Sequence, residues 1–128
     1  MPVAASFDYA LLRVVPRVER QEFINAGVVV YCPERQFLGA RVYLDRDRLT
    51  ALWPEVDLAL IVPHLEAVER ICAGNPEAGV IAKLSQRERF HWLTSPRSTI
   101  VQPSPVHTGV CYETDALLDR LERQFLRP

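Results

Sequence analysis

The side chains best suited to chemistry are concentrated in residues 87–109, a stretch with arginines, histidines, several hydroxyls and three prolines. Proline interrupts helices and strands, so this stretch should form a rigid loop that holds polar groups still. The guanidinium of Arg97, the hydroxyls beside it and successive backbone amides can surround a phosphate or a carboxylate. The sequence therefore predicts an anion- or partner-binding site with these members: Arg89, Arg97, Ser98, Thr99 and Ser104.

A structural interpretation of the same stretch stays open. Arg97 can pair with a carboxylate such as Glu88, and the hydroxyls can satisfy loop amides. In that case the stretch is a well-tied connection between elements and not a binding site.

The same residues also allow acid–base chemistry. His107 can act as a general base oriented by Glu88, with Ser98, Thr99 or Ser104 as the nucleophile. No serine stands in a G-x-S-x-G elbow, and a histidine between apolar residues is more often a structural hydrogen-bonding group. A small hydrolase that uses Arg97, Ser98 and His107 is therefore an alternative to a binding protein.

No metal site or cofactor is expected. The three histidines and three cysteines share no ligand spacing, and the five glycines are scattered singly, so no glycine-rich phosphate loop is present. Cysteines this far apart are typical of small buried side chains in a reducing compartment. The amino terminus lacks a basic segment followed by an apolar run, so we expect a cytoplasmic protein.

Composition and charge narrow the class of protein. The 128 residues are 48% apolar and 24% charged, which predicts one folded domain over residues 1–128. A net charge of -1 gives no general attraction to nucleic acid, although arginines lie beside Phe90 and Trp92. Charged residues or prolines interrupt every apolar stretch, so no membrane span is expected.

The first third of the chain predicts three antiparallel strands. Residues 7–15 and 28–32 are rich in aromatic and β-branched side chains, and the second run holds three consecutive valines. Residues 25–27 tolerate unusual backbone angles and should form a connection before that run. A turn at 33–36 should return the chain as a third strand over 37–44.

The rest of the chain predicts mainly helices. Apolar residues follow Asp45 and Asp47 at helical spacing, which predicts a first helix there. A second helix should start at Pro54, and the helical segment should end at residues 74–76. Pro63 either starts a fresh helix or kinks the existing one. Ser85 and Glu88 form a capping box, which predicts a helix over 86–93.

Two extended segments and a closing helix complete the predicted elements. Residues 98–102 and 106–111 should be extended, and a helix should begin at residue 113 or 114. The predicted class is α+β, with an antiparallel sheet of about five strands covered by helices on one face and a C-terminal helix.

Several sequence elements have a familiar pattern. They are Tyr-Ala-Leu-Leu-Arg-Val-Val-Pro-Arg at 9–17, Glu-Phe-Ile-Asn-Ala-Gly-Val at 22–28, Arg-Phe and Trp-Leu within 89–93, Pro-Arg-Ser-Thr at 96–99, and Ser-Pro-Val-His-Thr-Gly at 104–109. With these elements, the chain resembles the bacterial domain of unknown function 3037 over nearly its whole length. The resemblance implies a small cytosolic bacterial protein, often encoded beside a HipA-like kinase, and it assigns no catalytic role to any residue.

The first functional hypothesis is a non-catalytic accessory module that docks on a protein partner, such as a HipA-like kinase. It would use residues 87–109 and the connection over 17–27. The second hypothesis is a phosphate- or carboxylate-binding protein, or a small hydrolase, centred on Arg97. Nucleic-acid binding ranks below both, and self-association is compatible with the sequence.

Overall fold

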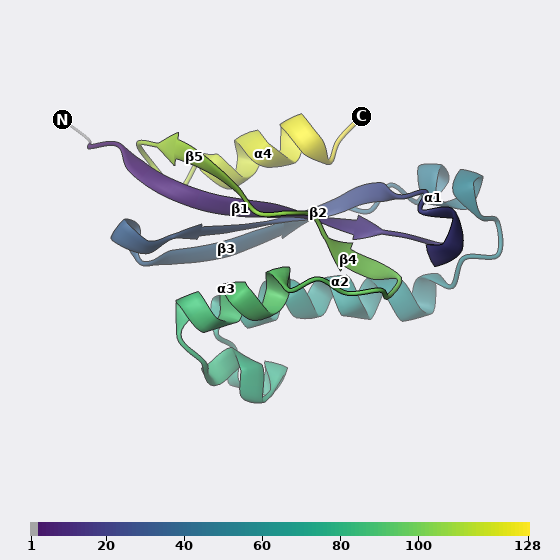
Figure 1. Ribbon diagram of the computed structural model, residues 1–128, viewed down its shortest axis with the longest axis horizontal. Helices are drawn as coiled ribbons and strands as arrows, with labels where there is room; N and C mark the ends of the chain where they lie inside the picture. Colours follow the sequence, from purple (N-terminus) through teal and green to yellow (C-terminus); the bar gives the residue numbers. More distant parts are fainter. Residues whose placement is uncertain (1–2) are drawn as a thin grey trace.

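The computed structural model describes residues 3–128 and contains a five-stranded antiparallel sheet with four α-helices (Figure 1). This arrangement confirms the predicted α+β class. The strands are β1 (Ala5–Val14), β2 (Ile24–Cys32), β3 (Phe37–Val42), β4 (Val101–Pro103) and β5 (His107–Cys111). The α-helices are α1 (Arg46–Leu52), α2 (Leu58–Ala73), α3 (Gln86–Thr94) and α4 (Leu117–Phe125). Short 3-10 helices span Val18–Arg20, Pro33–Arg35, Pro76–Ala78 and Val80–Lys83.

Strand β1 is the long central strand of the sheet. It pairs with β2, which in turn pairs with β3. On its other side β1 pairs with β5 through its first half and with β4 through its last residues, so that two short strands share one edge (Figure 1). The edge is interrupted between β4 and β5, where Pro105 stands, because proline has no ladder donor.

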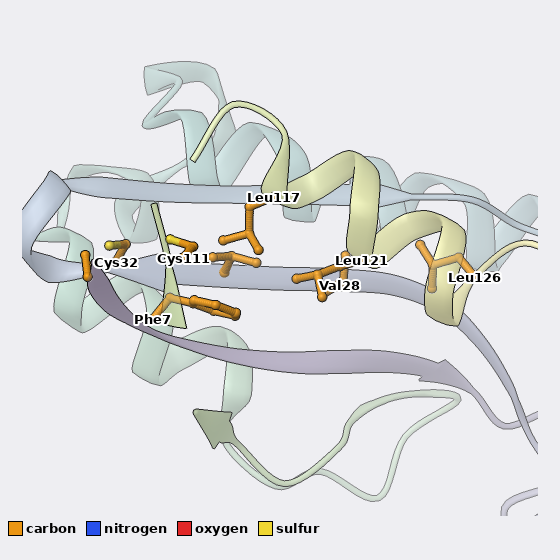
Figure 2. Close-up of a cluster of buried hydrophobic side chains, with 9 residues drawn as sticks. Phe7, Val28, Cys32, Cys111, Leu117, Leu121 and Leu126 are labelled. Atoms are coloured by element: carbon orange, nitrogen blue, oxygen red, sulfur yellow. The ribbon is translucent and has the colours of Figure 1, made fainter. Parts of the chain in front are cut away.

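The sheet is covered by helices on both faces. Val28 and Val30 of β2 belong to a core cluster with α4, whereas Val29 belongs to a cluster with α2 and α3, and all three are 0% exposed. A strand that is apolar at successive positions must be buried on both faces, because its side chains alternate. The middle helices cover one face, as the sequence predicts. Helix α4 covers the other face, which the expectation of a single helical layer did not include (Figures 1 and 2).

Strand β2 begins earlier than expected. Residues 25–27 were predicted to form a connection, but the strand starts at Ile24 and passes through them. The ladder with β1 shifts register between Leu12 and Arg13, which absorbs one extra residue of β2 as a bulge. Gly27 serves close packing there, since a Cβ at this position would lie 3.1 Å from Cδ1 of Leu12.

The helix boundaries follow polar caps. The Ser85–Glu88 capping box is present at the start of α3, and Gly74 ends α2 with a φ of 71°, both as predicted. Helix α2 does not open at Pro54; it begins at Leu58 because the carboxylate of Asp57 accepts from a free helical amide. Pro63 lies inside α2, which continues past it.

The closing helix begins later than predicted, at Leu117 rather than at residue 113 or 114. Its residues Leu117 and Leu121 pack with Phe7 and Val28 on the sheet (Figure 2). Between residues 3 and 128, no helix is both long enough and apolar enough to cross a membrane.

Candidate functional site

Residues 95–103, which include β4, separate two hollows on opposite faces of the sheet. The segment is tied to the sheet by the Val15 amide, which donates to the Ile100 carbonyl at 2.7 Å. The side-chain amide of Gln102 donates to the Thr99 carbonyl at 2.7 Å. The backbone of this segment is therefore held in place, as its prolines predict.

Strand alternation gives the two hollows different walls. Pro103 is paired with Leu12 of β1, and both side chains line the hollow beside α2. Gln102 is paired with Arg13, and both line the hollow on the opposite face. Because neighbouring side chains on a strand point to opposite faces, one short strand supplies apolar groups to one site and polar groups to the other.

The first hollow, the Arg97 cleft, has a volume of about 370 Å³ and lies between α2, α3 and the β1–β4 edge. Most of its walls are apolar, which is typical of sites for small apolar or amphipathic groups. The lining residues are Leu12, Pro63, His64, Ala67, Val68, Ile71, Trp92, Leu93, Arg97, Val101 and Pro103.

Arg97 is the residue of this lining whose side chain stays positively charged at any pH near neutrality. Its guanidinium carbon lies 4.3 Å from the centroid of the Trp92 ring, and a terminal nitrogen donates to the Trp92 carbonyl. Burial lowers the pKa of Arg97, which indicates that the cation has lost part of its hydration. The ion pairs among residues 3–128 do not include Arg97, so the guanidinium has no protein counter-charge.

His64 stands on the α2 wall of the cleft. Burial lowers the pKa of this imidazole, and the nearby positive charge of Arg97 lowers it further. A lowered pKa keeps His64 neutral at pH 7, so it contributes a hydrogen-bonding group and no charge.

The second hollow, the Arg13 pocket, has a volume of about 250 Å³ and a polar lining. It lies between β1, β4 and the connection from β1 to β2. The guanidinium carbon of Arg13 lies 4.3 Å from the centroid of the Phe23 ring. The lining residues are Arg13, Val15, Val18, Gln21, Phe23, Ser98 and Gln102.

Arg89, a predicted site residue, has a structural position instead. Its Nη1 donates to the carbonyls of Ile71 and Cys72 at 2.8 and 2.9 Å, and its Nε donates to the Leu84 carbonyl at 3.0 Å. These bonds satisfy carbonyls at the carboxyl end of α2 and join it to α3. Three of the five N–H donors of Arg89 are therefore used within the protein.

Ser104, another predicted site residue, is 3% exposed and completes the ladder at the broken sheet edge. Its hydroxyl accepts from the Leu11 amide at 2.8 Å and donates to the Pro105 carbonyl at 2.9 Å. Its own amide donates to the Leu11 carbonyl at 2.7 Å. The serine hydroxyl thus replaces a backbone partner where the chain is interrupted by proline.

The remaining hydroxyls and carboxylates are placed separately. The Thr99 hydroxyl donates to the Val101 carbonyl at 2.8 Å, and Ser98 lines the Arg13 pocket. Glu88 accepts from the Ser85 hydroxyl and amide in the capping box, at 2.9 and 3.4 Å. Glu88 therefore forms no pair with Arg97, contrary to the structural interpretation of the sequence.

The structure does not bring together the groups of the proposed hydrolase. His107 is exposed on β5, and its ring centroid lies 5.6 Å from that of Tyr9, a residue of the α4 face. Arg97 lies on the opposite face with α2, and Ser98 lines the other hollow. Arg97, Ser98 and His107 thus occupy three different environments and share no reacting point.

The cysteines are placed in the core. Burial raises the pKa of Cys72 to about 12, and burial together with the adjacent Cys32 thiol raises the pKa of Cys111. Raised pKa values keep these two thiols protonated near neutral pH, where a thiolate would be needed for nucleophilic attack. Across the described part of the chain, no three His, Cys, Asp or Glu side chains gather closely enough to hold a metal ion.

The connection over 17–27, which the first hypothesis assigned to a docking surface, contributes Phe23 to the Arg13 pocket, but sequence reasoning missed Arg13 and His64. The sequence contains one indication that Arg13 differs from its neighbours. Phe7, Tyr9 and the residues that follow at every second position of β1 are apolar until Arg13 interrupts the row. A charge at such a position marks the place where a strand leaves the apolar core.

Comparison with known families gives one match over most of the chain. The model described as "Protein of unknown function (DUF3037)" matches residues 9–126. Neither the curated proteins nor the solved structures contain a significant match. The chain therefore belongs to the DUF3037 family.

Proposed function

We propose that this chain is a non-catalytic binding module whose Arg97 cleft receives an apolar group that ends in a carboxylate. The observation that carries the proposal is the Arg97 guanidinium, partly desolvated and without a counter-charge at an apolar cleft of about 370 Å³. The group can belong to a small amphipathic acid or to the carboxyl-terminal residue of a partner protein. The expected protein partner, such as a HipA-like kinase, is one source of such a terminus.

The apolar walls support the apolar half of this ligand. Val68 and Ile71 of α2, Leu93 of α3 and Val101 of β4 form a continuous apolar lining. Removing apolar surface from water stabilises a complex by roughly 25 cal/mol per Å². A carboxylic acid with an apolar chain of about eight carbons can bury that chain against this lining, so it is a suitable probe of the cleft.

The position of Arg97 supports the charged half. The stack on Trp92 and the bond to the Trp92 carbonyl orient the guanidinium and leave further donors without a protein partner among the described residues. A planar guanidinium can bind a carboxylate through two parallel hydrogen bonds. The neutral imidazole of His64 offers an additional polar contact in the same cleft.

The separation of the candidate catalytic groups favours binding over hydrolysis. A hydrolase of the predicted kind needs a nucleophile and its base within hydrogen-bond reach. Ser98 and His107 lie in different environments, and neither lines the Arg97 cleft. The geometry therefore gives no support to a reaction built on Arg97, Ser98 and His107.

The proposal is tested with octanoate and its uncharged counterpart 1-octanol. The chain has two tryptophans, so a Trp53→Phe variant reports only on Trp92 at the cleft. We expect octanoate to change this fluorescence saturably and to bind roughly tenfold more tightly than 1-octanol. Arg97→Gln should remove that preference. Arg87 is exposed on α3 and does not line the cleft, so Arg87→Gln should retain the preference.

A peptide experiment distinguishes the two sources of the carboxylate. A short peptide that ends in leucine is compared with the same peptide carrying an amidated carboxyl terminus. Preference for the free terminus would identify a partner's chain end as a ligand, and binding of octanoate alone would identify a small acid. If neither probe binds, or if Arg97→Gln binds octanoate as well as the parent chain, the proposed function is wrong.

A further inference from the structure

We infer that the Arg13 pocket is a second, independent binding site, which takes a phosphate group. The site lies on the opposite face of the sheet from the Arg97 cleft; β1 and the segment 95–103 contribute to both hollows, but no residue lines both. The inference therefore stands apart from the proposed function and uses different residues.

The first argument is the state of Arg13. Its side chain is partly buried in the sheet and stacks on Phe23, yet no hydrogen bond or ion pair joins its guanidinium to residues 3–128. Its Nε is buried and has no hydrogen-bond partner among the described residues. Arg13 therefore contributes a positive charge to the lining of the pocket, and no carboxylate of the described residues is paired with it.

The second argument is the kind and direction of the polar groups. Arg13 comes from β1, Gln102 and Ser98 come from β4 and the residues before it, and Gln21 comes from the connection between β1 and β2. The groups approach from three segments, which suits a tetrahedral oxyanion better than a planar carboxylate. Glutamine and serine side chains both donate and accept, and a hydrogen phosphate has oxygens for both roles.

The third argument is electrostatic. The lining of the pocket holds one cation and no carboxylate, so nothing in it repels an anion. The volume of about 250 Å³ leaves room beside a phosphate group for part of an ester substituent. The phosphate can therefore be inorganic phosphate or that of a phosphomonoester.

The backbone at the rim of the pocket makes a tight turn. Gln21 has a φ of 55°, in the left-handed region that non-glycine residues rarely adopt. Its amide donates to the Val18 carbonyl and closes the 3-10 turn Val18–Arg20. This turn places Val18, Gln21 and Phe23 along one rim of the pocket.

The inference is tested by titrating the full chain with inorganic phosphate at low ionic strength, followed by amide NMR. We expect saturable shifts for the amides of Gln21, Ser98 and Gln102, and weaker binding of acetate. Arg13→Gln should lower phosphate affinity roughly tenfold or more, and Gln102→Ala should lower it by a smaller factor. A parallel titration with glycerol 2-phosphate shows whether the ester or the free anion binds more tightly.

The two sites supply each other's controls. Arg13→Gln should retain octanoate binding at the Arg97 cleft, which also shows that the variant is folded, and Arg97→Gln should retain phosphate binding. If Arg13→Gln does not fold, Gln102→Ala and Ser98→Ala decide the question, since Gln102 lies on the short edge strand β4 and Ser98 lies in the loop before it. The inference is overturned if phosphate fails to bind, if acetate binds equally well, or if Arg97→Gln weakens phosphate as much as Arg13→Gln.

Discussion

The Arg97 cleft and the Arg13 pocket share one wall and one type of cation, yet they are chemically opposite. In each, a guanidinium carbon lies 4.3 Å from an aromatic centroid, that of Trp92 in the cleft and that of Phe23 in the pocket. Apart from its arginine and His64 the cleft is lined by apolar residues and Trp92, whereas the pocket adds Gln21, Ser98 and Gln102 to three apolar residues. Strand alternation sets the neighbours of each arginine, and we expect those neighbours to determine which anion each site prefers.

Arg89 serves as the reference for an arginine with a structural role, because each of its hydrogen bonds goes to a backbone carbonyl. We expect Arg89→Ala to lower the free energy of unfolding by about 2–3 kcal/mol, since it leaves helix-end carbonyls unpaired. Arg97→Ala should cost about 1 kcal/mol or less, the typical value of an exposed stack on an aromatic ring. Urea denaturation of both variants measures the contrast, and equal losses would mean that Arg97 is a structural residue.

Ser104 tests whether the shared wall is held by the sheet edge. We expect Ser104→Ala to lower the free energy of unfolding by about 1–2 kcal/mol, because the buried Leu11 amide loses its acceptor. Ser98→Ala, which removes an exposed hydroxyl from the same wall, should stay within about 0.5 kcal/mol of the parent. A similar cost for both serines would remove the distinction between an anchoring and a site-lining hydroxyl.

Filling the cleft should separate the two sites. Ala67 lines the Arg97 cleft from α2, so we expect Ala67→Phe to occupy the cavity and lower octanoate affinity roughly tenfold. Phosphate binding at the Arg13 pocket should not change. Ala59→Phe, an exposed substitution on the same helix, is the matched control for surface hydrophobicity. Loss of phosphate binding in Ala67→Phe would show that the hollows are coupled.

The smallest expected effect concerns the pKa of His64. We expect NMR titration to place this pKa below the ordinary histidine value, and Arg97→Gln to raise it partly, because burial is the larger cause. A pKa lowered by folding means that the unfolded chain binds the proton more readily, so this group opposes folding as the pH falls below about 6.5. An unchanged pKa in Arg97→Gln would place the guanidinium away from the imidazole.

Local patterns were enough to predict much of the scaffold. The apolar run at 28–32, the Ser85–Glu88 capping box and Gly74 each act within a few residues, and each has the predicted role. The start of β2 was wrong because its bulge depends on pairing with β1. The predicted start of α2 at Pro54 was wrong because the cap at Asp57 outweighed the helix-opening preference of proline.

The candidate site was harder to predict, because its residues are distant in sequence. The stretch 87–109 does contain Arg97 and Ser98, but these residues line different hollows. Arg89 and Ser104 look the same in the sequence as residues with free donors. Only their distant partners, the carbonyls of α2 and the backbone of Leu11, show that their polar groups are already occupied.

The sequence by itself determined the secondary elements and the α+β class, since caps, turns and apolar periodicity act over short distances. It also determined that arginine would supply almost all the positive charge, with a single lysine at Lys83. Only the tertiary structure decided that Arg13 and Arg97 stand on opposite faces of one sheet with their donors largely free. The physical reason is that burial and hydrogen-bond satisfaction depend on which distant segments meet, and strand pairing sets those meetings.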